Sequence, residues 1–181
     1  MKIIFATGNK NKMTEIRQIL RDLGMEILSM KEAGIDVDIV EDGTTFEENA
    51  LIKGKAVAAH CNDIVLADDS GLEIDYLNKE PGIYSARYAG TDTSYDIKNS
   101  LLLSRMKGAP DKQRTARFVC AIAAVMPDGA LLTTEGTGCP WNDGRMYWLR
   151  NRRSKWIWLR SDLFPAGIRL HLGRACTGKE E

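Results

Sequence analysis

The stretch from Leu66 to Leu72, LADDSGL, limits most strongly what this chain can fold into. The apolar run from Ile64 to Leu66 stops at two aspartates, a serine and a glycine, a pattern typical of a buried strand that ends at a polar turn. Repulsion between adjacent carboxylates at a strand end is costly unless a cation meets them. The stretch therefore predicts one of two things: a solvated Asp-Ser-Gly turn, or a site where Asp68 and Asp69 hold a hard cation such as Mg²⁺.

Composition limits the classes of protein that need considering. A chain of 181 residues that is 44% hydrophobic and 28% charged is typical of one soluble globular domain. Its formal net charge of zero gives no overall reason to expect a nucleic-acid or membrane partner. The balance is uneven, with 16 Lys and Arg against 21 Asp and Glu in residues 1–137 but nine against four in residues 138–181. We therefore expect an α/β domain over 1–137 and an atypical basic tail, rich in Trp and Arg, over 138–181.

The cysteines and the N-terminus indicate where the protein works. The cysteines are spaced far apart and the chain has two histidines, so a zinc site is not expected. Free thiols are typical of a reducing compartment. The apolar run at the N-terminus is too short for a signal peptide, and no segment reaches the length of a membrane span. We expect a cytoplasmic protein with four free thiols: Cys61, Cys120, Cys139 and Cys176.

The N-terminal residues predict a strand, a turn and a helix. Lys2–Ala6 is a short apolar run, residues 7–9 (TGN) form the turn, and a helix from Lys12 to a capping Gly24 follows, with apolar residues at helical spacing: Met13, Ile16, Leu20 and Leu23. Such a turn presents backbone N–H groups and the positive end of a helix dipole, which suits phosphate. TGNKNK is neither a Walker A loop nor a dinucleotide fingerprint, so an ordinary loop remains the alternative.

A second helix is expected after Glu41. Thr44 or Thr45 can cap its N-terminus, and apolar residues fall on one stripe of it: Phe46, Ala50 and Val57. Asn49 and Lys53 lie along the same side of the helix. These two side chains either extend to water or reach into a cleft, and in the second case Lys53 becomes a phosphate ligand.

The following residues predict further strands and one more helix. A separate strand is expected over Glu73–Leu77 and a glycine-bounded loop over Pro81–Gly90. Ile97, Leu101 and Met106 predict the inward face of a helix. Two strands then pair across a PDG turn: Thr115–Val125 and Ala130–Thr134. The alternation predicts an α/β protein with a central mixed, twisted sheet flanked by helices.

Four sequence blocks, in this order and spacing, resemble the inosine triphosphate pyrophosphatase family, also called HAM1-like or nonstandard purine NTP pyrophosphatases: ATGNKNKMTEI, EDGTTFEENALIKGKA, LADDSGLEIDYL and PGIYSARYAG. The resemblance covers Met1 to about Thr137. It implies an ITPase/Maf-like fold and Mg²⁺-dependent hydrolysis of a nucleoside triphosphate to the monophosphate and pyrophosphate. The family's preferred substrates are ITP, dITP and XTP, whose removal cleanses the nucleotide pool, and its members are usually homodimers.

The resemblance also implies a role for each matching residue. Glu41 and Asp69 would bind Mg²⁺, with Asp68 adjacent, and Asp69 would be the proton acceptor. Lys53 and Arg87 match further substrate-binding positions. The remaining contacts to the substrate and its triphosphate would be Thr7, Gly8, Asn9, Lys12 and Ser70. These roles agree with the chemistry, because phosphoryl transfer depends on positioning and on neutralising charge.

After about Thr137 the resemblance ends. Family members continue with a segment like GFGYDPIF and later with a lysine and an SHR motif, which cradle the base, and this sequence has none of them. Four tryptophans and seven arginines occupy the tail instead, a composition that also suits a nucleic-acid surface. A nucleotide-binding protein with impaired or no turnover is the other alternative, because the base-recognition segment is missing.

A one-base frameshift is a simpler explanation of the tail. Back-translation of Lys155–Pro165 with permitted codons, read from the second base, gives NGFGYDPIYF, and each Trp in that segment forces a Gly where the family has one. We infer a frameshift from about Gly138 onward, which keeps the triphosphate half of the site and loses the base pocket. It predicts low activity, poor base selectivity and aggregation. Sequencing the gene tests the hypothesis, because a single-base change must restore GFGYDP.

Overall fold

A computed structural model describes residues 2–110, 113–138, 147–150 and 156–159 of the chain. Five strands form one sheet in the order β2-β1-β3-β4-β5. β1 pairs in parallel with β2 and β3, whereas β4 pairs antiparallel with β3 and β5. This arrangement confirms the predicted mixed sheet of an α/β protein. The strands are β1 (Lys2–Phe5), β2 (Glu26–Ser29), β3 (Ile64–Ile74), β4 (Ala116–Val125) and β5 (Leu131–Gly138).

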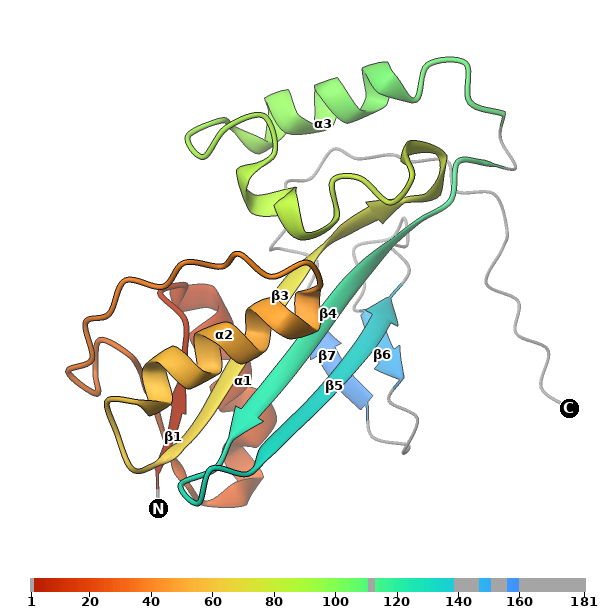
Figure 1. Ribbon diagram of the computed structural model, residues 1–181. Coiled ribbons are helices and arrows are strands. Elements are labelled where there is room, and N and C mark those ends of the chain that lie inside the picture. Colours follow the sequence, from red (N-terminus) through yellow and green to blue (C-terminus); the bar gives the residue numbers. More distant parts are fainter. Residues whose placement is uncertain (1, 111–112, 139–146, 151–155, 160–181) are drawn as a thin grey trace, which may run out of the picture.

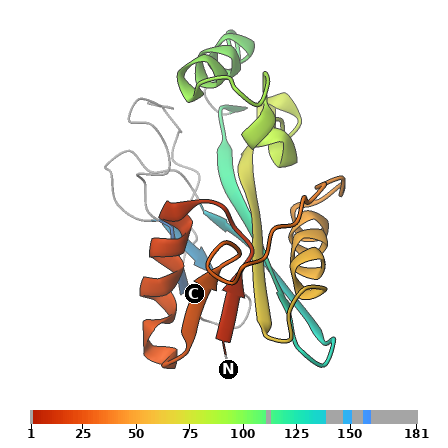
Figure 2. The ribbon, with the colours of Figure 1, turned by 90° about the vertical axis from the view of Figure 1, so that its left-hand side faces the viewer.

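Helices cover both faces of the sheet (Figures 1 and 2). α1 (Lys10–Leu20) lies on one face and α2 (Phe46–Ala58) on the other. α3 (Tyr95–Arg105) and the short helix η3 (Gly82–Arg87) lie around the ends of β3 and β4 that extend beyond β1 (Figure 1). Among the described residues, no helix combines the length and apolarity needed to cross a bilayer.

The N-terminal strand, turn and helix form as predicted, except at the end of the helix. After Leu20 the chain tightens into the 3₁₀ helix η1 (Arg21–Leu23), which ends at Gly24 with a φ of 63°. Leu23 was expected on the buried stripe but is 57% exposed. The tighter winding of a 3₁₀ turn rotates Leu23 away from the stripe that α-helical spacing predicts.

β3 corrects the interpretation of LADDSGL. The predicted polar turn is wrong, because Asp68, Asp69, Ser70 and Gly71 lie inside one strand of 11 residues. β4 pairs with this strand continuously, from Val65↔Val125 to Ile74↔Ala116. The ladder to β4 satisfies the backbone of the polar residues, so the chain has no need to turn there. The separate strand expected after them is the end of β3, followed by a short 3₁₀ helix, η2 (Asp75–Leu77).

α3 forms where it was predicted but buries a different face. Ile97 and Leu101 are 59% and 41% exposed, whereas Lys98, Leu102 and Met106 are buried. The buried lysine takes the inward position because its ammonium group donates to the carbonyl oxygen of Ala86. The apolar pattern alone therefore placed the inward face one residue too early at Ile97 and Leu101, whereas Met106 is buried as predicted.

α2 packs its predicted stripe against β4. Phe46 and Ala50 form one cluster with Val119, Ala121 and Ala123. Val57 belongs to a second cluster and is fully buried. The stripe thus fixes the helix across β3 and β4 and brings its polar residues to the middle of β3.

The first turn of α2 provides a test of local stability. Thr45 is the N-cap, and its hydroxyl oxygen accepts from the N–H of Glu48 at 3.1 Å. Thr45→Ala is expected to lower the free energy of unfolding by about 1 kcal/mol, because one N–H of the helix loses its acceptor. Urea denaturation measures the loss. Thr14→Ala is the control, because that exposed hydroxyl donates to the carbonyl oxygen of Lys10 and caps no N–H group; an equal loss in both variants would contradict the prediction.

The cysteines and the tail are described only in part. Cys61 and Cys120 are free, and burial raises the pKa of the Cys120 thiol to about 12. Two further strands pair antiparallel in the tail, β6 (Tyr147–Arg150) and β7 (Trp156–Leu159). Cys139 and Cys176 lie outside the described residues, as does nearly all of the tail (138–181) to which the proposed frameshift applies.

Candidate active site

The candidate site lies where β1 ends and β3 continues. β1 pairs with β3 only from Ile3↔Ile64 to Phe5↔Leu66. Beyond Leu66, no described strand pairs with the edge of β3 that faces β1. The sheet order places β2 on one side of β1 and β3 on the other, so the connections reverse direction at this point. Ligands of α/β proteins bind outside the carboxyl ends of strands at such switch points.

The TGN turn enters the site between β1 and α1. The side chain of Asn9 caps α1 and accepts from the N–H of Asn11 at 2.9 Å, and the hydroxyl of Thr7 accepts from the N–H of Asn9 at 3.1 Å. Gly8 has open space where a Cβ would stand. The turn is therefore ordered by its own side chains at the positive end of a helix of 11 residues, as anion binding requires.

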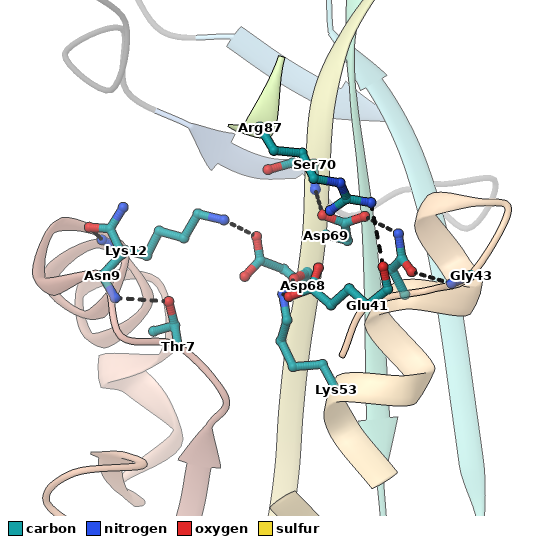
Figure 3. Close-up of polar contacts among 11 residues, drawn as sticks. Thr7, Asn9, Lys12, Glu41, Gly43, Lys53, Asp68, Asp69, Ser70 and Arg87 are labelled. Carbon is teal, nitrogen blue, oxygen red and sulfur yellow. Dashed lines mark hydrogen bonds and ion pairs between the residues drawn. The ribbon is translucent and has the colours of Figure 1, made fainter. Parts of the chain in front are cut away.

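Lys12 reaches from the first turn of α1 to β3. Its Nζ lies 2.6 Å from Oδ2 of Asp68, and both side chains are largely shielded from solvent (Figure 3). Burial lowers the pKa of Lys12, but the Asp68 carboxylate more than offsets this, so the pKa is raised. The lysine is therefore a fixed positive charge beside the TGN turn.

Asp68 and Asp69 point to opposite faces of the sheet, because successive side chains of a strand alternate. Asp68 extends toward Lys12, and Asp69 extends toward the side of α2 (Figure 3). Ser70, two residues after Asp68, shares the face of Asp68 and is half-buried. The structure therefore separates the side chains of the adjacent aspartates that the sequence placed in one metal site.

Lys53 joins the segment before α2 to β3. Its Nζ lies 3.0 Å from Oε1 of Glu41 and donates to the carbonyl oxygen of Asp68 at 2.9 Å. The second contact uses a backbone carbonyl close to the open edge of β3. Lys53 therefore does not extend to water, because its ammonium group contacts Glu41 and the backbone of β3.

Asp69 interacts through its charge with both Lys53 and Glu41. Its Oδ1 accepts from the N–H of Ser70 at 2.9 Å and its Oδ2 from the amide of Asn49 at 3.1 Å. Burial raises the pKa of Asp69, and the charge of Glu41 adds to this, while the Asn49 hydrogen bond and the charge of Lys53 oppose it. A half-buried carboxylate with a raised pKa that interacts with a second carboxylate is suited to accept a proton or to meet a cation.

Arg87 approaches the same segment from η3. Its guanidinium group donates to the carbonyl oxygen of Glu41 at 3.4 Å and stacks over the ring of Tyr84 with 4.9 Å to the centroid. Figure 3 shows Arg87 above Asp69 and Glu41. The structure thus brings this predicted residue to the site through a backbone contact.

Comparison with known proteins identifies the family of this chain. A sequence model of the Ham1 family matches residues 3–141. The chain belongs to the Ham1 family. It is 47% identical over 141 residues to the dITP/XTP pyrophosphatase of Clostridium perfringens, covering 75% of this chain and 69% of that protein. It is 47% identical over 133 residues to the Bacillus subtilis protein of the same name, covering 74% and 67%.

Solved structures of Ham1 proteins share the fold. The Staphylococcus aureus Ham1 protein superposes with a TM-score of 0.69 at 37% identity, over 80% of this chain and 74% of that one. A HAM1 protein from Coxiella burnetii gives 0.70 at 36% identity, over 80% and 75%. The ITPase-like α/β fold expected from the sequence is therefore confirmed.

The acidic residues of this Ham1-family chain fit a cation that arrives with a phosphate ligand. Within residues 2–110 and 113–138, no three His, Cys, Asp or Glu side chains stand close enough together to hold a metal by themselves. Mg²⁺ in nucleotide sites is held by one or two carboxylates together with phosphate oxygens and water. Glu41 and Asp69 provide two carboxylates whose charges interact. Glu41 is also paired with Lys53, as Asp68 is with Lys12.

Sequence reasoning missed the parts that Gly43 and Asn49 play in this Ham1-family site. It assigned Gly43 no role, and it left Asn49 between solvent and cleft. Asn49 is in fact 0% exposed and contacts both Gly43 and Asp69. A signal was present, because an asparagine between Phe46 and Ala50 stands on a helix face that is otherwise apolar.

Proposed function

We propose that this protein hydrolyses nonstandard purine nucleoside triphosphates, ITP, dITP and XTP, to the monophosphate and pyrophosphate in the presence of Mg²⁺. The observation that carries the proposal is the position of two lysines and two carboxylates around the open edge of β3: Lys12, Lys53, Glu41 and Asp69 (Figure 3). The names of the relatives support the substrate class, since they are dITP/XTP pyrophosphatases.

The side chains divide the chemistry between them. Lys12 and the TGN turn at the N-terminus of α1 would neutralise and orient the triphosphate, and Lys53 would offset charge on the leaving pyrophosphate. These groups are held by protein partners before substrate binds, so little reorganisation accompanies the reaction. Glu41 and Asp69 would hold Mg²⁺, which neutralises phosphate oxygens and lowers the pKa of water. Asp69 would accept the proton of the attacking water.

The test is an assay of pyrophosphate release from ITP, dITP, XTP and dATP, side by side, with and without Mg²⁺. We expect pyrophosphate from the first three and none without the metal. A comparable rate with dATP would be the loss of base selectivity that the frameshift hypothesis predicts. Orthophosphate instead of pyrophosphate would contradict the proposed bond cleavage. Nucleotide binding without release of either would establish the alternative, a nucleotide-binding protein without turnover, which the names of the relatives do not favour.

Lys53 gives a prediction within this proposal. Lys53→Met is expected to lower kcat/KM for dITP by about 10²-fold, because Glu41 and Asp69 lose the cation between them and the leaving group loses a counter-charge. Initial rates of pyrophosphate release measure the effect. Lys55→Met, an exposed lysine of the same helix, is the matched control and should retain the wild-type rate. Equal rates in the two variants would show that Lys53 does not contribute to turnover.

The proposal includes a homodimer in the cytoplasm, as the family resemblance suggests. Light scattering on the protein eluted from a size-exclusion column is then expected to give twice the chain mass of 20.2 kDa. A single-chain mass at assay concentration would contradict the dimer.

A further inference from the structure

Asn49 is a polar side chain with 0% exposure on the packed face of α2. Burying an amide is costly unless its donor and its acceptor both find partners. Among the described residues, no buried side-chain nitrogen or oxygen lacks a hydrogen-bond partner. Asn49 therefore occupies this position because of the two groups that it contacts.

The two contacts have a fixed direction. The backbone N–H of Gly43 donates to Oδ1 of Asn49 at 2.9 Å, and Nδ2 of Asn49 donates to Oδ2 of Asp69 at 3.1 Å. A backbone N–H can only donate, so it determines which end of the amide is oxygen. The NH₂ group must then face Asp69. Its donation favours the ionised carboxylate and fixes the plane of that carboxylate.

Gly43 lets the preceding segment approach closely enough for this contact. A Cβ on Gly43 would lie 2.7 Å from Oδ1 of Asn49 and 2.8 Å from Cβ of Glu48. Gly43 stands two residues after Glu41, whose carboxylate pairs with Lys53. One buried amide thus joins the segment that carries Glu41 to the carboxylate of Asp69.

We propose that Asn49 is a positioning residue that holds Asp69 and the Glu41 segment in the relative arrangement that turnover requires. The inference rests on the proposed function, because Glu41 and Asp69 are its two carboxylates. Asn49 acts through these groups and is not placed in contact with substrate. A purely structural asparagine would stabilise α2 without affecting the rate of the folded enzyme.

Two variants of the full chain separate these roles. Asn49→Asp keeps the acceptor for Gly43 but turns a carboxylate oxygen toward Asp69, and Asn49→Leu removes both contacts at similar volume. Val57→Ala is the control, because Val57 is equally buried on the same helix and lies in a different cluster. Each protein is titrated with an α,β-methylene analogue of dITP and Mg²⁺, so that kcat is expressed per binding-competent site.

We expect both Asn49 variants to lose about 10²-fold in kcat per site while Kd for the analogue changes by less than about threefold. Val57→Ala should melt at a lower temperature with its kcat per site unchanged. Asn49 variants that behave like Val57→Ala overturn the inference and leave the proposed function intact. Absence of pyrophosphate release by the wild type overturns the proposed function instead.

An NMR measurement decides the inference without turnover. Asp69→Ala should shift the backbone amide resonance of Gly43 in the wild-type background and leave it in place when Asn49→Leu is also present. If the Gly43 resonance does not respond to Asp69→Ala, Asn49 does not couple Asp69 to the Glu41 segment, and the inference fails.

Discussion

Replacing Asp69 with asparagine is expected to lower the rate of pyrophosphate release from dITP by about 10³-fold. The substitution keeps the size of the side chain and removes the group that would accept the proton and meet the cation. Initial rates at saturating Mg²⁺ and dITP measure the loss. The variant separates loss of chemistry from loss of folding, because removing a charge from this site does not by itself destabilise the fold.

The stability of this variant should change little. Burial raises the pKa of Asp69 above its ordinary value, so at neutral pH the ionised carboxylate opposes folding when no cation is bound. Asparagine removes that cost but leaves one of the two donors, the N–H of Ser70 or the amide of Asn49, without an acceptor. Because the two effects oppose each other, we expect a Tm within a few degrees of the wild type. Asp63→Asn is the control: this half-buried aspartate just before β3 accepts from the N–H of Lys2 at 3.4 Å and should retain full activity. Loss of activity together with a lower Tm would indicate unfolding rather than lost chemistry.

Replacing Gly71 with alanine is expected to lower the free energy of unfolding by about 3 kcal/mol. A Cβ there would lie 2.4 Å from the carbonyl oxygen of Gly82, 2.6 Å from Oγ of Ser85 and 2.9 Å from Phe46. The hydroxyl of Ser85 also links η3 to β3, since it accepts from the N–H of Leu72 at 2.9 Å. The added methyl group therefore pushes η3 away from the sheet.

Thermal denaturation measures this effect, with an expected drop in Tm of about 10 °C for a chain of this size. Activity should fall as well, because η3 carries Arg87. Gly8→Ala is the stability control, since a Cβ at Gly8 meets nothing within 4 Å. The close approach of η3 to β3 is refuted if Gly71→Ala, Gly8→Ala and the wild type have the same Tm.

Local sequence patterns were sufficient for several elements. The strand, TGN turn and helix at the N-terminus, the capped helix after Thr45, and the hairpin of β4 and β5 are all present. Each depends on interactions a few residues apart, such as the capping bond from Glu48 N–H to Thr45. Such interactions are encoded by residue type and spacing.

Two predictions were wrong where contacts between segments far apart in the sequence determine the local structure. LADDSGL was expected to turn, yet β4 keeps it extended through a continuous ladder. The inward face of α3 was misplaced because a lysine, Lys98, is buried by its bond to a backbone carbonyl. Periodicity of apolar residues cannot anticipate a polar group that finds its partner in another segment.

The sequence by itself determined which residue types meet at the end of β1: a glycine turn, two lysines and acidic side chains. Only the tertiary structure decided which face each side chain takes. Lys12 stands 56 residues before its partner Asp68, and Asn49 stands 20 residues before Asp69. The physical reason is that a buried charge takes the position where a partner satisfies it, and the fold alone brings that partner within reach.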